Sequence, residues 1–197
     1  LSIRRQRQMC IRDSYRRALV IGADQLSSYV DWSDRGSCIL FGDGAGAVAI
    51  ESNMDINNLC GFIMRTDGDR GSFLNLPSKN EIGTLNDDLV FKKGDFSTIT
   101  MNGQEVYKFA IREVPIIIEN LLKETKYSAK EIDWLLLHQA NQRILDAVGE
   151  RVKIAKSKVL SNLSNYGNTS AATIPLMLDE SVRNNNCLLY TSDAADE

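Results

Sequence analysis

The 197-residue sequence contains a single histidine, His138, and only three prolines. It has no apolar run of the roughly 20 residues that a membrane-spanning helix needs, so we expect no membrane span. Its 23 basic and 26 acidic residues give a net charge of −3. Because nucleic-acid-binding proteins usually carry a basic stripe, this balance argues against such a partner.

Cysteine is also scarce, with four residues in the whole chain. Cys10 and Cys187 lie close to the two ends, which leaves Cys38 and Cys60. These two have neither the spacing of metal ligands nor a disulfide framework. We therefore expect no metal site, and we expect free thiols in a reducing cytoplasm.

The two ends lack the apolar periodicity of a folded segment. One DNA string that resembles a transposase-type sequencing adapter encodes residues 4–14 in one orientation and residues 187–197 in the other. We therefore interpret residues 1–14 and 187–197 as adapter-derived scars rather than natural protein. Two disordered natural tails are the alternative. The natural part then spans residues 15–186 and is a truncated reading frame.

Short apolar runs predict strands, and periodic runs predict helices. The predicted strands cover residues 17–23, 37–41, 47–50, 134–137 and the segment that starts at 159. The predicted helices cover residues 103–125, 141–153 and 169–182, with a capping box over residues 128–131. A Gly-rich bend at 42–46 suggests close backbone approach to another segment. This alternation predicts an α/β fold with a mainly parallel or mixed sheet.

Three short motifs contain the candidate functional residues. They are Asp34-Arg35-Gly36 leading into Phe41–Ala47, His138–Ile144, and Gly167–Ala172. His138 follows an apolar strand and precedes a helix, which is where α/β folds place sites, although a lone histidine is more often structural. Asn168 lies in a turn-like stretch, where asparagine is commonly a loop residue. The glycines at 42–46 lead into a strand rather than a helix, which excludes a dinucleotide-binding loop.

In this order and spacing, the three motifs resemble the β-ketoacyl-acyl-carrier-protein synthase III family of condensing enzymes. The resemblance implies a thiolase-like layered α/β fold, present in part. Residues 15–64 would end its N-terminal half, and residues 65–186 would form most of its C-terminal half. The family's nucleophilic cysteine would precede the present N-terminus, and its last strands would follow residue 186.

The resemblance also implies an activity for the full-length parent. It would condense an acyl-coenzyme A primer with malonyl-acyl carrier protein (malonyl-ACP), release carbon dioxide and give 3-oxoacyl-ACP through an acyl-cysteine. The parent would be a cytoplasmic homodimer that initiates fatty acid synthesis. No cofactor is implied, because the coenzyme A (CoA) thioester and the phosphopantetheine of ACP are substrates.

The same resemblance assigns roles to individual residues. His138 and Asn168 would both donate hydrogen bonds to the malonyl thioester oxygen, with His138 acting as a neutral imidazole. An asparagine as the second donor distinguishes this group from the elongating synthases, which use a second histidine. The residues implied to bind substrate or CoA are Arg35, Phe41, Gly103 and Gln104. The residues implied to meet the acidic carrier protein are Lys108, Arg143 and Arg151.

Two alternatives remain open at this point. The chain could come from another thiolase-fold condensing enzyme, such as a polyketide-type or 3-hydroxy-3-methylglutaryl-type synthase. It could also come from a non-catalytic partner subunit that lacks the cysteine by nature. The upstream gene, with or without a cysteine among small residues, would discriminate between an enzyme and such a subunit.

Overall fold

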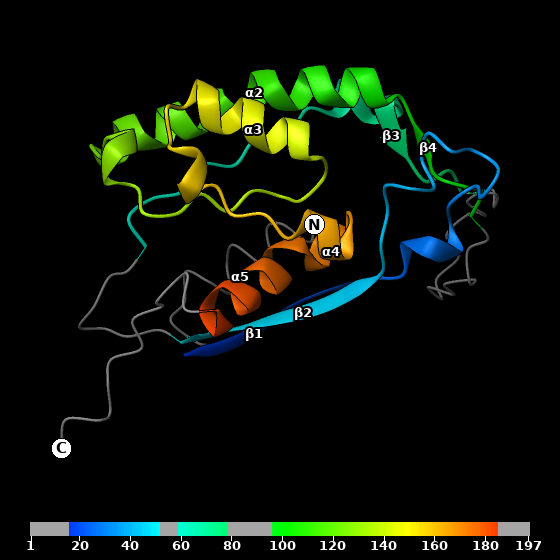
Figure 1. Cartoon of the computed structure of the whole chain (residues 1–197), viewed down its shortest axis with the longest axis horizontal. Helices are drawn as coiled ribbons and strands as arrows, with labels where there is room; N and C mark the ends of the chain where they lie inside the picture. The colour runs from blue at the N-terminus through cyan, green and yellow to red at the C-terminus, as the bar shows by residue number, and fades with distance from the viewer. Residues whose placement is uncertain (1–15, 52–58, 79–95, 185–197) are drawn as a thin grey trace, which may run out of the picture.

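The computed structural model describes residues 16–51, 59–78 and 96–184. Helices and strands both occur, which confirms the expected α/β class. In Figure 1, helix α5 (Thr173–Arg183) lies along the ribbon formed by strands β1 and β2. Helices α2 (Gly103–Thr125) and α3 (Gln142–Arg151) pack side by side in a separate layer. Both expected scars, residues 1–14 and 187–197, lie outside the described residues.

Strands β1 (Arg17–Asp24) and β2 (Gly44–Glu51) pair antiparallel, with Gly22 opposite Gly46. The prediction of a strand at 17–23 is confirmed. The Gly-rich segment is not the expected bend throughout, because Gly44 and Gly46 belong to β2 itself. A second antiparallel pair joins β3 (Leu74–Asn75) to β4 (Thr100–Met101). Parallel contacts occur as isolated bridges, so the strand directions are mixed.

The predicted strand at 37–41 is wrong, because this segment forms turns and only Phe41 makes a bridge. The carboxylate of Asp34 explains the difference. It accepts hydrogen bonds from Gly36 N at 2.9 Å and from Ser37 Oγ at 2.6 Å. These local bonds curl the chain away from an extended conformation. Cys38 is therefore a half-buried turn residue and not a residue inside a strand.

Helix α2 spans the predicted residues 103–125. Asn102 begins it by accepting a hydrogen bond from Glu105 N, and Lys126 ends it in the left-handed conformation at φ 63°. The predicted capping box is confirmed, with Ser128 and Glu131 bonded reciprocally around a short 3₁₀ turn. The predicted strands at 134–137 and from 159 are reduced to one parallel bridge between Leu135 and Val159.

The predicted helices at 141–153 and 169–182 are shorter in the structure. The side chain of Asn141 caps α3 by accepting from Arg143 N, so the helix begins at residue 142. Before α5, residues 170–172 form a 3₁₀ turn in which Ser170 has φ 50°. A four-residue helix, α4 (Leu163–Tyr166), precedes that turn.

The buried apolar core gathers around α3 and α5. Its members share exposed fractions of 8% or less and include Ile144, Leu145, Val148, Val152, Ile154, Ala172 and Met177. By contrast, Leu19, Val20 and Ile21 of β1 are more than half exposed. Within the described ranges, no helix combines the length and apolarity needed to cross a membrane.

Candidate active site

His138 lies in a short loop that a buried glutamine holds in place. The neighbouring Gln139 is fully buried, and its Nε2 donates to Leu137 O at 2.9 Å and to Leu160 O at 3.3 Å. Its Oε1 accepts from Asn162 N at 3.2 Å. These bonds tie both sides of His138 to the segment after residue 159. The Gln139 hydrogen bonds therefore hold the backbone from which the His138 side chain extends.

Asn168 lies in a tight turn beside Phe41. The two residues form a parallel bridge, in which Gly42 N donates to Asn168 O and Asn168 N donates to Leu40 O, both at 2.9 Å. Gly167 reaches this bridge with φ 67°, a conformation that favours glycine. The structure therefore brings the predicted residues Phe41 and Asn168 together, although 127 positions separate them in the sequence.

The orientation of the Asn168 amide follows from its hydrogen bonds. Ser170 N donates to Asn168 Oδ1 at 3.0 Å. Because a backbone N–H needs an acceptor, the amide oxygen faces Ser170 and the Nδ2 group faces the other way. Asn168 is 8% exposed, and its Nδ2 bonds to none of the described residues. The residue therefore offers an uncommitted N–H donor.

A chain of three hydrogen bonds joins His138 to Asn168. His138 Nδ1 lies 3.0 Å from Thr173 Oγ1, which donates to Ser170 O at 2.6 Å. Ser170 N then reaches Asn168 Oδ1. The two predicted catalytic residues are thus held in one small network, in which Thr173 and Ser170 are the links.

His138 presents its other nitrogen, Nε2, without a bond to any described residue. Part of His138 is open to solvent, but protein atoms packed around its ring remove water from it. This partial burial disfavours the charged form and lowers the pKa of His138. The ring is therefore mostly neutral near neutral pH. With Asn168 Nδ2, the site contains two ring or amide nitrogens that are free to act on a ligand.

Glycines allow the Asn168 turn to approach the β1–β2 ribbon. A Cβ atom at Gly22 would lie 2.2 Å from Ala171 O, and one at Gly42 would lie 2.1 Å from Tyr166 O. Ala171 N also donates to the Asp24 carboxylate at 3.0 Å, at the end of β1. The expected close approach of the Gly-rich segment is therefore confirmed, and its neighbour is the segment from residue 166 to the start of α5.

The residues expected to bind CoA lie in two exposed places. Arg35 stands at the tip of the Asp34 turn and makes no ion pair with a described residue. Hydrogen bonds from Ser37 and Gly36 hold the pKa of the Asp34 carboxyl below its usual value, which keeps the turn acceptor ionised. Gly103 and Gln104 form the exposed first turn of α2. The contacts of the described residues do not connect these two places to His138.

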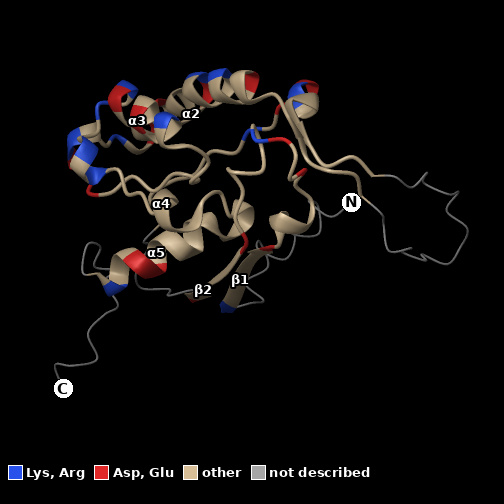
Figure 2. Ribbon diagram, turned by 45° about the vertical axis from the view of Figure 1, so that its right-hand side comes forward, with Lys and Arg blue, Asp and Glu red and all other residues tan. Residues whose placement is uncertain are grey.

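The three residues expected to dock a carrier protein all lie on the paired helices α2 and α3, which contain residues of both charges (Figure 2). Lys108 is 65% exposed and forms an ion pair with Glu105 at 2.7 Å. The guanidinium of Arg143 lies 5.3 Å from the centre of the Tyr107 ring, a cation–π contact. Arg143 thus contacts α2 through Tyr107, the residue next to Lys108 in the sequence.

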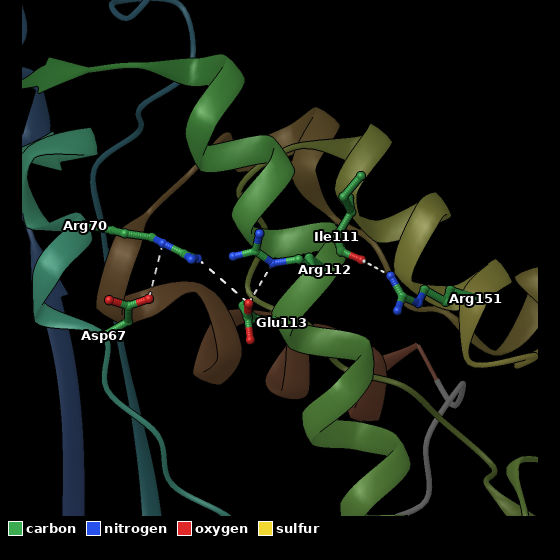
Figure 3. A network of polar contacts seen from close by, with 6 residues as sticks. All are labelled: Asp67, Arg70, Ile111, Arg112, Glu113 and Arg151. Carbon is green, nitrogen blue, oxygen red and sulfur yellow. Dashed lines mark hydrogen bonds and ion pairs between the residues drawn. The ribbon is translucent and has the colours of Figure 1, made fainter.

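Arg151 has a structural partner that the sequence did not indicate. Pro115 lies inside α2 and has no N–H to give to the carbonyl of Ile111, four residues earlier. Arg151 Nη1 donates to that carbonyl at 3.2 Å (Figure 3). Arg151 thus links α3 to α2 and satisfies a group that the proline leaves unpaired.

Figure 3 also shows an ion-pair chain on the other side of α2 from Arg151. Arg70 bridges Asp67 at 3.3 Å and Glu113 at 3.8 Å, and Arg112 pairs with Glu113 at 2.7 Å. These cations hold the pKa of the Glu113 carboxyl below its usual value, with Arg112 as the main cause. The network anchors the segment before β3 to α2, and its charges are already paired.

The described part of the chain contains no group of three or more His, Cys, Asp or Glu side chains placed to hold a metal ion. Two open hollows of about 460 and 500 Å³ lie beside α2 and against the start of β1 and the end of β2. Neither hollow borders His138 or Asn168. The candidate site is recognised by its hydrogen-bonding groups.

Sequence reasoning missed Thr173 and Gln139. Gln139 lies beside His138 in the chain, but nothing in the local pattern shows that its amide is buried. Thr173 lies 35 residues beyond His138, and only the fold brings its hydroxyl to the imidazole. The available signal was weak: a hydroxyl residue near the start of a predicted helix, which normally indicates capping.

Comparison with known proteins gives the family. Residues 2–68 match "3-Oxoacyl-[acyl-carrier-protein (ACP)] synthase III", and residues 122–188 match the C-terminal part of the same enzyme. A "Beta-ketoacyl-[acyl-carrier-protein] synthase III" from Prochlorococcus marinus subsp. pastoris is 70% identical over 171 residues, which are 87% of this chain and 51% of that protein. The chain belongs to the 3-oxoacyl-[acyl-carrier-protein] synthase III family.

A more distant synthase III, from a Synechococcus species, is 61% identical over 85% of this chain and 50% of its own length. The crystal structure of 3-oxoacyl-[acyl-carrier-protein] synthase III from Aquifex aeolicus aligns with a TM-score of 0.78 and 32% identity, over 94% of this chain and 55% of that one. The likeness confirms the expected thiolase-like α/β fold, present in part. The chain spans about half the length of the synthase III relatives that it matches.

Proposed function

We propose that this chain is part of a condensing enzyme that joins an acyl-CoA primer to malonyl-ACP, releases carbon dioxide and forms 3-oxoacyl-ACP. The observation that supports the proposal is the His138–Thr173–Ser170–Asn168 network. It leaves one nitrogen on each end residue uncommitted. Membership of the synthase III family, whose members are named for this reaction, supports the same activity.

In the proposed reaction, a cysteine thiolate of the intact enzyme attacks the primer thioester, and CoA leaves as the thiolate. Malonyl-ACP then loses carbon dioxide, and the electron pair of the broken C–C bond becomes an enolate. Its carbon attacks the acyl-cysteine, which releases the thiolate. His138 Nε2 and Asn168 Nδ2 would hold the enolate oxygen, where one such donor is typically worth about 3–4 kcal/mol.

The remaining assignments form part of the proposal. Phe41, which pairs with Asn168, would line the acyl site, while Arg35, Gly103 and Gln104 would contact CoA. Lys108 and Arg143 would meet the carrier protein. Because Arg151 already binds the Ile111 carbonyl, its contribution to docking would be secondary. We propose a cytoplasmic homodimer that initiates fatty acid synthesis and needs no metal or other cofactor.

The test is mutagenesis of Asn168 and His138 in the enzyme restored to its full length. Asn168→Asp is the sharpest change, because it keeps the oxygen that receives Ser170 N and replaces the N–H donor by a negatively charged acceptor. Asn168→Asp and His138→Ala should each slow malonyl decarboxylation by roughly 10²–10³-fold. Asn165→Ala, an exposed asparagine in α4, is the matched control and should leave the rate unchanged.

Acyl-enzyme labelling with radioactive primer, measured beside decarboxylation, separates the two half-reactions. Asn168→Asp should label at close to the parental rate, since the proposal gives this amide no part in primer transfer. A folded Asn168→Asp variant that decarboxylates malonyl-ACP at the parental rate would show that Asn168 is only a turn residue, and the proposed function would lose its main support.

A further inference from the structure

Thr173 is the one side chain that contacts the imidazole of His138 through a described hydrogen bond. It begins α5 and is 2% exposed. Its Oγ1 lies 3.0 Å from His138 Nδ1 and 2.6 Å from Ser170 O. The backbone N–H of Thr173 also donates to Ser170 O, so two bonds hold the residue on that carbonyl. Its hydroxyl is therefore fixed in position beside the ring.

A threonine hydroxyl has one proton to donate, and a carbonyl oxygen can only accept. The separation of 2.6 Å between Thr173 Oγ1 and Ser170 O is at the short end of the range for O–H···O hydrogen bonds. Without a proton between them, two oxygens at this distance would oppose their lone pairs. The hydroxyl proton therefore lies on the Ser170 side. The remaining contact, from Oγ1 to His138 Nδ1, needs its proton from the ring.

We propose that Thr173 is a positioning residue that holds neutral His138 in the tautomer with its proton on Nδ1 and a lone pair on Nε2. Burial lowers the pKa of His138, so the neutral ring, for which the tautomer matters, is the resting form. The expectation from sequence is that the neutral ring donates to the substrate, and the proposed tautomer differs from it. Its uncommitted nitrogen is an acceptor at rest.

The consequence for catalysis rests on the proposed function. Nε2 can first accept a proton, with an S–H bond of the thiol breaking and an N–H bond forming. The products are a thiolate and an imidazolium. Only then does Nε2–H donate to the malonyl thioester oxygen. In the tautomer set by Thr173, Nε2 must therefore act as a base toward the thiol before it can donate to the malonyl oxygen. Nδ1 keeps its proton throughout.

The test exploits the fact that His138 is the only histidine. The full chain, made without a histidine tag and with ¹⁵N-labelled histidine, gives one signal for each ring nitrogen. At a pH above the His138 pKa, a nitrogen that carries a proton and one that carries a lone pair differ widely in ¹⁵N shift. We expect Nδ1 to be the protonated one, in at least about tenfold excess, which corresponds to about 1.4 kcal/mol.

Two variants separate the hydroxyl from the shape of the side chain. Thr173→Val keeps the branched shape and removes the hydroxyl, so both tautomers should become populated and the two shifts should move toward each other. Thr173→Ser keeps the hydroxyl and should restore the parental shifts. A merely structural role for Thr173 would not predict this rescue.

The parental spectrum alone can overturn the proposal. A proton on Nε2, or an even mixture of tautomers, would mean that Thr173 donates to Nδ1 or does not control the ring. Unchanged shifts in Thr173→Val would also refute it. The NMR measurement uses no substrate, so it tests the tautomer of His138 alone. The decarboxylation assay tests the proposed function, and either hypothesis can therefore fail without the other.

Discussion

Arg151 and Pro115 should stabilise the helix pair in a coupled way, although they lie on different helices. Pro115 deprives the Ile111 carbonyl of its helical partner, and Arg151 Nη1 supplies a replacement at 3.2 Å. Arg151→Ala should therefore destabilise the chain by removing this bond. The same change in a Pro115→Ala background should cost less, because an alanine at position 115 can donate its own N–H to the Ile111 carbonyl.

The magnitudes follow from the geometry. A hydrogen bond of this kind contributes about 0.5–1.5 kcal/mol net, and the exposure of Arg151 favours the lower half of that range. Pro115→Ala alone combines opposing effects. It relieves a helix-interior proline, which costs about 3 kcal/mol relative to alanine, and it removes buried methylenes at about 0.8 kcal/mol each. Only the difference between backgrounds isolates the coupling.

The assay is a double-mutant cycle from urea unfolding followed by circular dichroism. We expect a coupling energy of about 0.5 kcal/mol or more between residues 151 and 115. Arg143→Ala is the matched control, since Arg143 is an exposed arginine of the same helix that contacts Tyr107 and not Ile111. If Arg151→Ala lowers the free energy of unfolding by the same amount in both backgrounds, Arg151 does not compensate for the missing N–H of Pro115, and the predicted coupling is refuted.

The other predictions concern packing, protonation and activity. Gly22→Ala should destabilise the chain by about 1–3 kcal/mol through overpacking against Ala171, while Gly71→Ala, with open space around it, should be close to neutral in the same urea titration. By NMR titration His138 should gain its proton below the pH of an ordinary histidine. As the pH falls, the histidine of the unfolded state is protonated first, because its pKa is the ordinary one. The stability of the folded chain should therefore decline as the pH falls below the ordinary histidine pKa, and His138→Gln should remove this part of the pH dependence. The 197-residue chain alone should give no 3-oxoacyl-ACP in a product assay, because neither Cys38 nor Cys60 hydrogen-bonds to His138 or Asn168. Product above the rate without enzyme would contradict this.

The sequence predicted best those features that local chemistry decides. Helix α2 has its apolar spacing, its Asn102 cap and a left-handed end at Lys126, and its predicted bounds agree with the structure. The capping box at Ser128 and Glu131 is equally local. The expected strand at 37–41 failed for a local reason too. The Asp34 carboxylate competes for backbone and hydroxyl donors, and a count of apolar residues does not include that competition.

The candidate site was predicted only in part, because its residues were identified one by one. His138, Asn168 and Phe41 do meet in the fold, yet the groups that connect them were not foreseen. A buried amide and a hydroxyl 35 residues away act through contacts that have no periodic signature in the sequence. Arg151, which is expected to dock a partner, also has a contact that the sequence did not indicate, since its side chain donates to a backbone carbonyl of the chain itself.

The position of the donors depends on strands that contain neither of them. Gly22 in β1 leaves room for the carbonyl of Ala171, and Gly42, two residues before β2, leaves room for that of Tyr166. The Asp24 carboxylate at the end of β1 accepts a hydrogen bond from Ala171 N. The turn that holds Asn168 and the start of α5 is therefore pressed against the β1–β2 ribbon. A side chain at Gly22 or Gly42 would displace this turn and with it the hydroxyl of Thr173. A substitution in the strands, such as one at Gly22, should thus alter the tautomer of His138 without a direct contact to the imidazole. This links the packing of the strands to the chemistry of the site.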